Sequence, residues 1–421
     1  MHAGLLLKDM FDAAIAAADP FRTVAPNLPR KPKGRAVVVG AGKASARMAQ
    51  AVEACWGECE GIVVVPYGSA LPCRGIRIVE ASHPVPDAAG ERASGEILSL
   101  LAELSEDDFA LFLISGGGSS LLSRPLDGVV LADKQAVNRQ LLMSGASIDE
   151  MNVVRKHLSA TKGGRLSAAA APATMLTLAI SDVPGDDVST IASGPTVPDS
   201  STVCDAKQII ERYGLKLPQQ MMAVLETPQA ATPEADSAVF ERSEVKIIST
   251  AQASLEAAAA VARKAGVTPV ILGDAIEGEA REVGKVMAGI ASQVHLHGQP
   301  VAGRVVLISG GETTVTVQGD AGKGGRNSEF LLSLALACWN IPELSAISCD
   351  TDGRDGSEFN AGALWLPEHR QIANRNEALD FLSRHDAFSF FKRYEAIVMT
   401  GPTHTNVNDF RAIYVETRDE G

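Results

Sequence analysis

Short apolar runs rich in valine and isoleucine alternate along this chain with alanine-rich stretches, and no other feature restricts the fold as much. In the first half of the chain these runs lie at residues 35–40, 61–66, 76–80, 110–114 and 174–180. Strands that are apolar throughout and separated by helices are typical of a parallel sheet with both faces buried. The sequence therefore predicts an α/β first domain with a doubly wound sheet.

The second half of the chain repeats this pattern after an irregular stretch. Residues 227–243 mix proline, alanine and acidic residues without periodicity, as a linker does. We therefore expect a first domain at residues 1–235 and a second, smaller α/β domain at residues 244–421. The apolar runs of the second domain lie at residues 245–250, 268–272, 304–309, 313–318, 345–349, 396–400 and 412–415.

The arrangement of the second domain is only partly determined by its sequence. Three residues separate the runs 304–309 and 313–318, which favours a hairpin and hence a mixed sheet. Whether the last strand packs back on the first domain stays open. A chain of 421 residues is long enough for two domains, and we expect the active site in the cleft between them.

The charge balance and the cysteines limit the partners and the compartment. The chain carries 51 acidic and 38 basic side chains, a formal net charge of −13. This charge disfavours nucleic acid and anionic lipid, so an anionic ligand requires a local cluster of donors. The six cysteines show no CxxC spacing, which predicts reduced thiols and a cytoplasmic protein.

The N-terminal segment, residues 4–18, is apolar but not a signal peptide. Charged residues interrupt it, while Leu7, Phe11 and Ile15 recur at helical spacing. We expect an amphipathic first helix. No stretch of the sequence reaches the roughly 18 uninterrupted apolar residues that a membrane span requires.

The first strand runs into a Gly-x-Gly turn that ends in a lysine. Gly40 and Gly42 precede Lys43, and Ser45 stands where a dinucleotide-binding fingerprint has its third glycine. The strand at residues 61–66 ends without the carboxylate that holds the ribose of NAD, which argues against a nicotinamide site. An ammonium group at a helix start opposes the macrodipole. This position favours a role for Lys43 in meeting an anion; the alternative is a surface lysine that points to water.

A second glycine-rich turn follows the strand at residues 110–114. It consists of Ser115, Gly116, Gly117, Gly118, Ser119 and Ser120. Such a turn can surround phosphate oxygens with backbone N–H groups and hydroxyl donors, although a flexible turn is the alternative. The chain contains no Walker motif.

This second turn has a shorter counterpart later in the chain. Residues 113–120 read LISGGGSS and residues 307–314 read LISGGETT, with Gly310, Gly311 and Glu312 at the turn. We expect both turns to present backbone N–H groups toward a shared crevice. A chance similarity of two strand ends is the alternative.

A helix is predicted to begin after residue 147. Ser147 and Glu150 have the spacing of a capping box. Arg155 and Lys156 lie on one polar face, for which a solvated surface is the usual interpretation. For His157 a structural role is favoured over proton transfer.

Acidic residues follow two of the predicted strands. The first group is Asp182, Asp186 and Asp187, and the second group is Asp350, Asp352 and Asp355. Carboxylates at the C-terminal ends of parallel strands lie where α/β sheets bind ligands. These residues are therefore candidates for holding Mg²⁺ or orienting a hydroxyl group. Asx turns explain Asp186 and Asp187 nearly as well, and for the second group metal binding and turn chemistry are equally favoured.

Two further segments carry polar groups at strand or helix ends. Arg326 stands at the start of the helix that follows residues 322–325, and an arginine fork suits a carboxylate or a phosphoryl group. Residues 400–409 (TGPTHTNVND) end a strand with hydroxyl and amide groups. A structural turn and a substrate contact explain this last segment equally well.

Eight ordered motifs together resemble those of the type II glycerate 2-kinases. They are VVVGAGKAS (37–45), ASHPVPD (81–87), LISGGGSS, MNVVRKHLSATKGG, SDVPGDD, GGRNSEF, CDTDGRDG and TGPTHTNVND. The resemblance covers essentially the whole chain. It implies a Rossmann-like first domain, a second domain of the MOFRL type, and an enzyme that uses ATP and Mg²⁺ to phosphorylate the C2 hydroxyl of D-glycerate.

The resemblance and the motif chemistry together give the expected site. The expected catalytic residues are Lys43, Arg326 and Asp182, of which the resemblance singles out the first two. The glycine-rich turns, with Gly40 and Gly42, are expected to bind nucleotide. The expected substrate-binding residues are Ser45, His83, Arg155, Lys156, Asn327, Thr403, His404 and Asn406. The expected metal ligands are Asp182, Asp187, Asp350, Asp352 and Asp355.

Two other functions stay open at this point. Proteins of this family are often labelled hydroxypyruvate reductases, so an NAD(P)H-dependent reductase is the alternative enzyme. A sugar-acid-binding regulator could use the same cations, but it would not need an acidic loop in each domain. The expected partners are D-glycerate and ATP, without nucleic acid or membrane, and homo-oligomerisation is left open.

Overall fold

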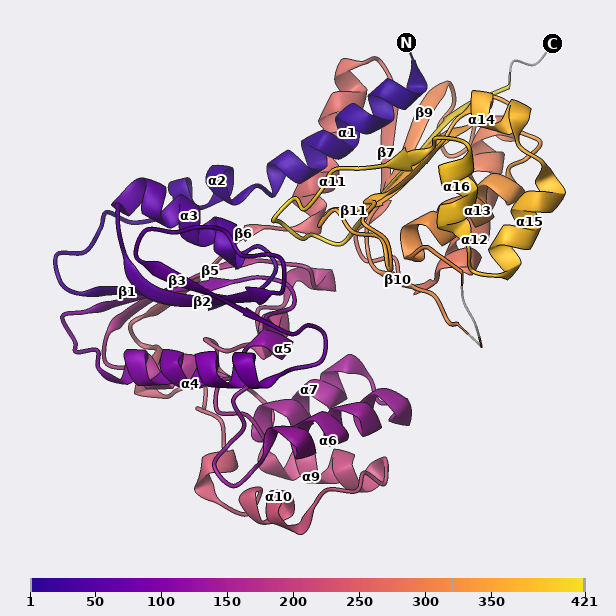
Figure 1. The fold of residues 1–421 in the computed structure, drawn as a ribbon. Helices are drawn as coiled ribbons and strands as arrows, with labels where there is room; N and C mark the ends of the chain where they lie inside the picture. The colour runs from indigo at the N-terminus through magenta and orange to yellow at the C-terminus, as the bar shows by residue number, and fades with distance from the viewer. Residues whose placement is uncertain (1, 318, 320–321, 419–421) are drawn as a thin grey trace. The chain divides into compact units, whose positions relative to one another are not determined.

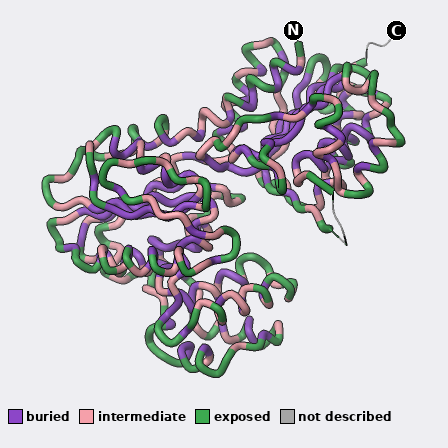
Figure 2. The backbone as a smooth tube through the Cα atoms, in the orientation of Figure 1, coloured by how far each residue is buried: buried purple, intermediate pink, exposed green. Residues whose placement is uncertain are grey.

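The computed structural model describes residues 2–317, 319 and 322–418. The chain forms two compact units: the first consists of Pro20–Ile248, and the second combines the N-terminal segment up to Asp19 with the chain from Ser249 onward. This division differs from the expected one at residues 235 and 244, in which the N-terminal helix belonged to the first domain. Figure 2 shows that the central strands of each unit are buried.

The first unit contains a six-stranded sheet with the order β3-β2-β1-β4-β5-β6. The strands are β1 (Ala36–Ala41), β2 (Glu60–Pro66), β3 (Ile76–Ala81), β4 (Phe109–Ile114), β5 (Thr174–Ile180) and β6 (Ser243–Ser249). The pairings from β3 to β5 are parallel. Helices α3 (Ser45–Trp56) and α4 (Ala88–Ala102) cover opposite faces of this sheet (Figure 1). The predicted doubly wound parallel sheet is confirmed, with the strand order of a Rossmann fold.

A group of helices in the first unit packs around a small core of its own. They are α6 (Leu131–Ser144), α7 (Ile148–His157), α9 (Val203–Arg212) and α10 (Gln219–Val224). Their buried contacts include Val137, Leu141, Val154 and Ile209. The predicted capping box at the start of α7 is confirmed, since Ser147 and Glu150 cap each other's backbone N–H groups. The short helices of the unit are α2 (Pro20–Thr23), α5 (Gly118–Leu121) and α8 (Arg165–Ala170).

The second unit contains a six-stranded mixed sheet with the order β13-β12-β11-β14-β9-β7. The strands are β7 (Thr268–Gly273), β9 (Arg304–Ser309), β11 (Ser345–Asp350), β12 (Gly362–Trp365), β13 (Ile397–Val398) and β14 (Asp409–Glu416). The β7–β9 pairing is parallel and the other pairings are antiparallel. The prediction of a mixed sheet is therefore confirmed.

Helices cover both faces of this second sheet (Figure 1). Val305 and Leu307 of β9 point to the side of α12 (Ala280–His297) and α13 (Arg326–Ala337), whereas Val306 and Ile308 point to the side of α1 (Ala3–Ala17) and α11 (Ala251–Lys264). This alternation is the two-residue period of a strand. The remaining helices are α14 (Pro367–Ile372), α15 (Arg375–Ser383) and α16 (Ala387–Arg393).

The structure corrects two expectations about strand placement and answers the open question about the last strand. The segment at residues 313–318 does not form a hairpin with β9, because its strand β10 (Thr313–Thr314) pairs in parallel with β8 (Gly278–Glu279); Gln318 lies outside the described residues. The last strand, β14, lies inside the second sheet between β11 and β9. The strand expected at residues 245–250 corresponds to β6, at the edge of the first sheet.

The N-terminal helix α1 belongs to the second unit because its apolar face is buried there. Leu7 and Phe11 are at most 1% exposed and pack in one cluster with Leu255 of α11 and Ile308 of β9. Burial of two such side chains stabilises this placement by roughly 3–6 kcal/mol. Over the described residues, no helix is both long and apolar enough to cross a membrane.

Candidate active site

The turns after β1 and β4 lie side by side at one edge of the first sheet. These strands are parallel neighbours, with Ala41 opposite Ile114 at their ends. The chain order reverses at this position, since β2 and β3 lie on one side and β4 and β5 on the other. In open α/β sheets such a switch point is where ligands bind. The fold therefore brings together the two turns that the sequence analysis singled out.

Hydrogen bonds join the two turns closely. The Lys43 amide donates to the Gly116 carbonyl at 2.9 Å, and the Ala44 amide donates to the Ser115 hydroxyl at 3.1 Å. A Cβ atom at Gly40 would lie 2.2 Å from the Leu113 carbonyl oxygen, so only glycine fits there. Gly40 thus has a packing role.

Ser45 and Gly42 also serve this contact between the turns. The Ser45 side chain is fully buried, and its hydroxyl donates to the Leu113 carbonyl at 3.0 Å. The expectation of a substrate contact by Ser45 is therefore corrected, because its hydroxyl is used inside the fold. Gly42 has φ 143°, and a Cβ there would meet the Ser115 hydroxyl.

The turn after β4 keeps several backbone donors without an intramolecular acceptor. Within the described part of the chain, no acceptor pairs with the amides of Gly116, Gly117 and Ser119. Gly117 adopts φ 82°, in the left-handed region that favours glycine. A cluster of such amides is suited to an anion. The predicted phosphate cradle thus has the donors it requires, and Gly118 closes the turn by donating to the Ser115 carbonyl at 3.2 Å.

Lys43 and His83 both lie close to Gly117. A Cβ atom at Gly117 would be 3.0 Å from the His83 ring and 3.6 Å from Cγ of Lys43. His83, Ser119, Ser120 and Arg155 line a pocket of about 230 Å³. The structure therefore brings together predicted residues from four separate motifs.

The helix α7 places Arg155 in this pocket but buries Lys156 and His157. Arg155 lines the pocket, and its Nε donates to Asn138 at 2.7 Å. Lys156 is only 7% exposed and forms an ion pair with Asp199 at 3.1 Å. The expected solvated face, and the substrate contact assigned to Lys156, are corrected because this face packs inside the unit. His157 is structural as predicted: Nδ1 contacts the Ala230 carbonyl at 2.7 Å.

The acidic loop after β5 behaves mainly as a turn. Asp187 accepts hydrogen bonds from the amide and hydroxyl of Ser189, both at 2.8 Å. This is the Asx-type contact given above as the alternative to metal binding. Asp186 adopts φ 56° in the same turn. Asp182 is the second residue after β5 and is half-buried.

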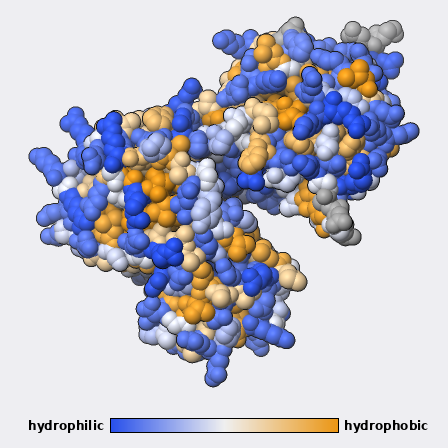
Figure 3. All heavy atoms as spheres, viewed as in Figure 1, coloured by the Kyte–Doolittle hydropathy of each residue, from blue (hydrophilic) through white to orange (hydrophobic). Residues whose placement is uncertain are grey.

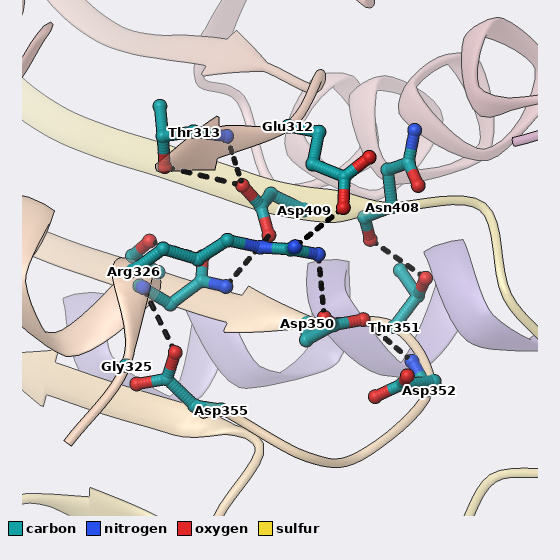
Figure 4. Close-up of polar contacts among 12 residues, drawn as sticks. Glu312, Thr313, Gly325, Arg326, Asp350, Thr351, Asp352, Asp355, Asn408 and Asp409 are labelled. Atoms are coloured by element: carbon teal, nitrogen blue, oxygen red, sulfur yellow. Dashed lines mark hydrogen bonds and ion pairs between the residues drawn. The ribbon is translucent and has the colours of Figure 1, made fainter. Parts of the chain in front are cut away.

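In the second unit, Arg326 is surrounded by three carboxylates that come from distant parts of the chain (Figure 4). Its Nε contacts Asp409 at 2.8 Å, its NH2 contacts Asp350 at 2.8 Å and its NH1 contacts Glu312 at 2.5 Å. Burial opposes the charge of Arg326, but Asp409, Asp350 and Glu312 outweigh it and raise the pKa of Arg326 above its usual value. All three edges of the guanidinium are therefore engaged.

Asp409 also connects Arg326 to a second, buried arginine. Arg411 is 1% exposed, forms an ion pair with Asp409 and donates to the Gly310 carbonyl at 3.0 Å. Sequence reasoning did not select Asp409 or Arg411. Asp409 stands at the end of the motif at residues 400–409, which was the available signal, whereas Arg411 lies inside an apolar strand.

Asp355 and Asn327 organise the start of α13. The two Asp355 oxygens accept the amides of Asn327 and Ser328, both at 2.9 Å. Burial raises the pKa of Asp355 to about 6, against the lowering effect of these donors. Asn327 is fully buried and donates to Asp409 at 2.7 Å. Both expectations, a metal ligand at 355 and a substrate contact at 327, are corrected because these groups are used inside the unit.

The other predicted residues of the second unit shape the loops around Asp350. The Gly310 amide donates to Gly273 at 2.8 Å, so it is engaged within the fold. The Thr403 hydroxyl donates to the Thr351 carbonyl at 2.6 Å.

Three more predicted residues lie in these same loops. The Asp409 amide donates to the Gly311 carbonyl at 3.0 Å, and Asn406 accepts the Asn408 amide at 3.3 Å. His404 has φ 56° in the same loop as Thr403. Gly311 and Asn406 thus support the loops that carry Asp409 and Asn408.

The expected metal ligands do not form a cluster. Among the described residues, no group of three or more His, Cys, Asp or Glu side chains is placed to hold a metal ion. Asp350 pairs with Arg326, its Oδ1 also accepts the Asp352 amide at 3.0 Å, and Asp352 accepts the Arg354 amide at 2.9 Å. A divalent ion held by protein side chains alone therefore does not fit this arrangement.

Comparison with known proteins gives matches along most of the chain. Residues 6–226 match a family described as a domain of unknown function, DUF4147, and residues 305–409 match the MOFRL family. A protein of Agrobacterium vitis with the provisional name hydroxypyruvate reductase is 53% identical over 99% of this chain and 95% of its own length. The D-glycerate 2-kinase of Thermotoga maritima is 40% identical over 94% of each chain. The crystal structure of glycerate kinase from the same organism has a TM-score of 0.88, at 37% identity over 98% of this chain and 99% of that one.

Proposed function

This chain belongs to the glycerate 2-kinase family, and from that premise we propose that it transfers the γ-phosphoryl group of ATP to the C2 hydroxyl of D-glycerate. The products are ADP and 2-phospho-D-glycerate. The observation that carries the proposal is the turn after β4, whose Gly116, Gly117 and Ser119 amides have no acceptor among the described residues and lie beside Lys43. Phosphoryl transfer depends mainly on such positioned donors and cations.

We assign Lys43 to the charge that develops on the transferred phosphoryl group. An ammonium group beside backbone donors stabilises the equatorial oxygens more in the transition state than in the ground state. The glycine turn fixes where this charge lies, because the Lys43 amide is tied to the Gly116 carbonyl at 2.9 Å. Asp182, two residues after β5, is our candidate for accepting the C2 hydroxyl proton.

Arg326 would serve the substrate anion. Of its three carboxylate partners Glu312 is the outermost, with a side chain 51% exposed against 5% for Asp350. We therefore propose that a carboxylate or phosphoryl oxygen replaces Glu312 on the NH1 edge of Arg326 when substrate binds. The Asp409 and Asp350 contacts would then hold the guanidinium plane in position.

Mg²⁺ is proposed to enter with the nucleotide. This ion commonly uses only one or two protein carboxylates together with substrate phosphates, which agrees with the lack of a three-residue cluster among the described residues. The chemistry that the ion supplies is neutralisation of phosphate charge. Omission of Mg²⁺ should therefore abolish turnover while leaving the melting temperature of the free protein unchanged.

The proposed activity is tested with MgATP and D-glycerate, followed by phosphorus NMR of the product. The expected result is a phosphate ester at C2 and one ADP per ester. An ester at C3 alone, or no ADP release, would refute the proposal. The reductase named for the Agrobacterium vitis relative is tested with hydroxypyruvate and NADH or NADPH at 340 nm. We expect no oxidation of the coenzyme, because β2 ends at Pro66 and is followed by Tyr67 and Gly68 rather than by a ribose-binding carboxylate.

A further inference from the structure

The pocket beside the turn after β4 is lined by cationic side chains that have no role in the phosphoryl transfer proposed so far. It lies between that turn and the helices α6 and α7, and its volume is about 230 Å³. Lys134, Arg155 and Lys162 all line it. Lys134 is 9% exposed and Lys162 is 2% exposed, which is unusual because lysine is almost never buried without a partner of opposite charge.

In the part of the chain that the structure describes, the two lysines donate hydrogen bonds only to neutral oxygens. Lys134 Nζ donates to the Ser123 carbonyl at 3.0 Å. Lys162 Nζ donates to both the carbonyl and the hydroxyl of Ser119, the latter at 3.1 Å, and to the Leu122 carbonyl at 3.4 Å. Among the described residues, neither lysine forms an ion pair with a carboxylate. An ammonium group has three donors, so Lys134 retains two for a ligand.

Arg155 adds a third positive group to the same pocket. Its Nε and NH1 contact the side-chain oxygens of Asn138 and Asn152 at 2.7 and 3.5 Å. Burial lowers its pKa. Burial also lowers the pKa of Lys134 to about 7, with Glu91 opposing and Arg155 adding to this effect. Burial and the neighbouring Lys134, Arg155 and Lys156 lower the pKa of Lys162. A bound anion would remove this unfavourable accumulation of charge.

The rest of the pocket is apolar. Its wall consists of Pro84, Pro86, Val137, Leu141, Leu142, Val154 and Leu158. Leu142 is 63% exposed, and its neighbour Met143, which does not line the pocket, is 87% exposed. Figure 3 shows apolar side chains at the surface over this helical part of the first unit. Glycerate has no apolar surface to place against such a wall, whereas a nucleobase has two apolar faces.

We propose that this pocket is the nucleotide site, with the base against the apolar wall and the phosphates held by Lys134, Arg155, Lys162 and the free amides of the turn after β4. The inference rests on the proposed kinase function and deepens it. It assigns anion-binding roles to Lys134 and Lys162, and it separates the nucleotide from the hydroxy acid. The ligand class is a nucleoside di- or triphosphate.

The first test places a bulky side chain at the exposed part of the wall. Leu142→Trp should weaken the binding of ADP and of adenosine at least about tenfold in calorimetric titration of the full chain. Met143→Trp, on the same helix but outside the pocket, is the matched control and should bind both as the wild type does. Because both positions are exposed, their melting temperatures should agree with that of the wild type.

The second test separates the phosphates from the base. Arg155→Gln should weaken ADP about tenfold and adenosine much less, since only ADP contacts the cations. Arg139→Gln, at an exposed position of α6, should leave both ligands unchanged. If the Arg155→Gln variant does not fold, ADP binding by the Leu142→Trp variant tests the nucleotide site on its own.

The outcomes separate this inference from the proposed function. A wild-type kinase whose Leu142→Trp variant binds ADP normally would overturn the nucleotide site and leave the function standing. A variant that raises the KM for D-glycerate without changing ADP binding would assign the pocket to the hydroxy acid and also overturn the inference. A wild type that neither binds ADP nor phosphorylates D-glycerate would refute both.

Discussion

Removal of Arg326 should destabilise the second unit by an amount that depends on pH. Arg326→Met leaves Asp350 and Asp409, which are 4% and 1% exposed, without their common partner. Arg411 remains next to Asp409, but Asp350 is left as a buried charge. Breaking a buried ion pair by removing one partner costs about 3–5 kcal/mol. We expect a loss in this range at pH 8.

The same reasoning gives the sign of the pH dependence. Carboxylates that have lost their cation can take up protons as the pH falls, and a neutral carboxyl is cheaper to bury than a carboxylate. The loss caused by Arg326→Met should therefore be smaller at pH 5 than at pH 8. A purely packing effect of the substitution would not change between these pH values.

Urea unfolding followed by tryptophan fluorescence measures this effect. Trp339 and Trp365 report on the second unit, because both pack near its core. The matched control is Arg384→Met, which breaks an ion pair of the same 2.8 Å length to Asp380 with side chains 52% and 62% exposed. Exposed pairs contribute roughly 0–1 kcal/mol. Equal losses in the two variants, or a loss for Arg326→Met that does not change with pH, would refute the argument.

Three other predictions follow from the same structure. Lys43→Ala should lower kcat by about 10²–10³ without changing the melting temperature, because the side chain serves transition-state charge; a near wild-type kcat would remove Lys43 from the site. Lys134→Met should raise the free energy of unfolding by a few kcal/mol at pH 6 and by much less at pH 10. The pKa of Lys134 is about 7 in the folded protein and about 10.4 in the unfolded chain. The stability of the wild type therefore rises with pH between these two pKa values. A gain that is equal at both pH values would contradict this. Asp355→Asn should lower the free energy of unfolding more at pH 4.5 than at pH 7.5. Burial raises the pKa of Asp355 to about 6, so the stability of the wild type falls as the pH rises from about 4 to 6. Unfolding curves of the variant and the wild type at the two pH values measure this loss. A larger loss at pH 7.5 than at pH 4.5 would be inconsistent with a raised pKa of the buried Asp355.

The local elements of this protein could be predicted from its sequence. The strand at residues 174–180 is found at those residues as β5, and the helix predicted for residues 4–18 is α1 (Ala3–Ala17). The capping box of α7 was visible as Ser147 and Glu150. These features depend on the period of apolar side chains and on contacts three or four residues apart, so the sequence itself contains the information.

Part of the candidate site was predictable for the same reason. The two glycine turns had to follow β1 and β4, and parallel strands end at one edge of a sheet. Once β1 and β4 are neighbours, the Lys43 turn and the Gly117 turn must meet. Arg326 was found by its position at a helix start, but the sequence did not indicate that Glu312, Asp350 and Asp409 would pair with it.

Only the tertiary structure decided which distant residues meet. Glu312, Asp350 and Asp409 surround Arg326 because β14 inserts between β11 and β9, and the local pattern of a strand does not specify its neighbours. Lys134 and Lys162 lie 28 positions apart in sequence (162 − 134), and α6 carries Lys134 to the same pocket only when its apolar face packs in the helical core. Burial of these lysines, and hence their chemistry, results from long-range packing, whereas the sequence determined the strands, helices and turns that are packed.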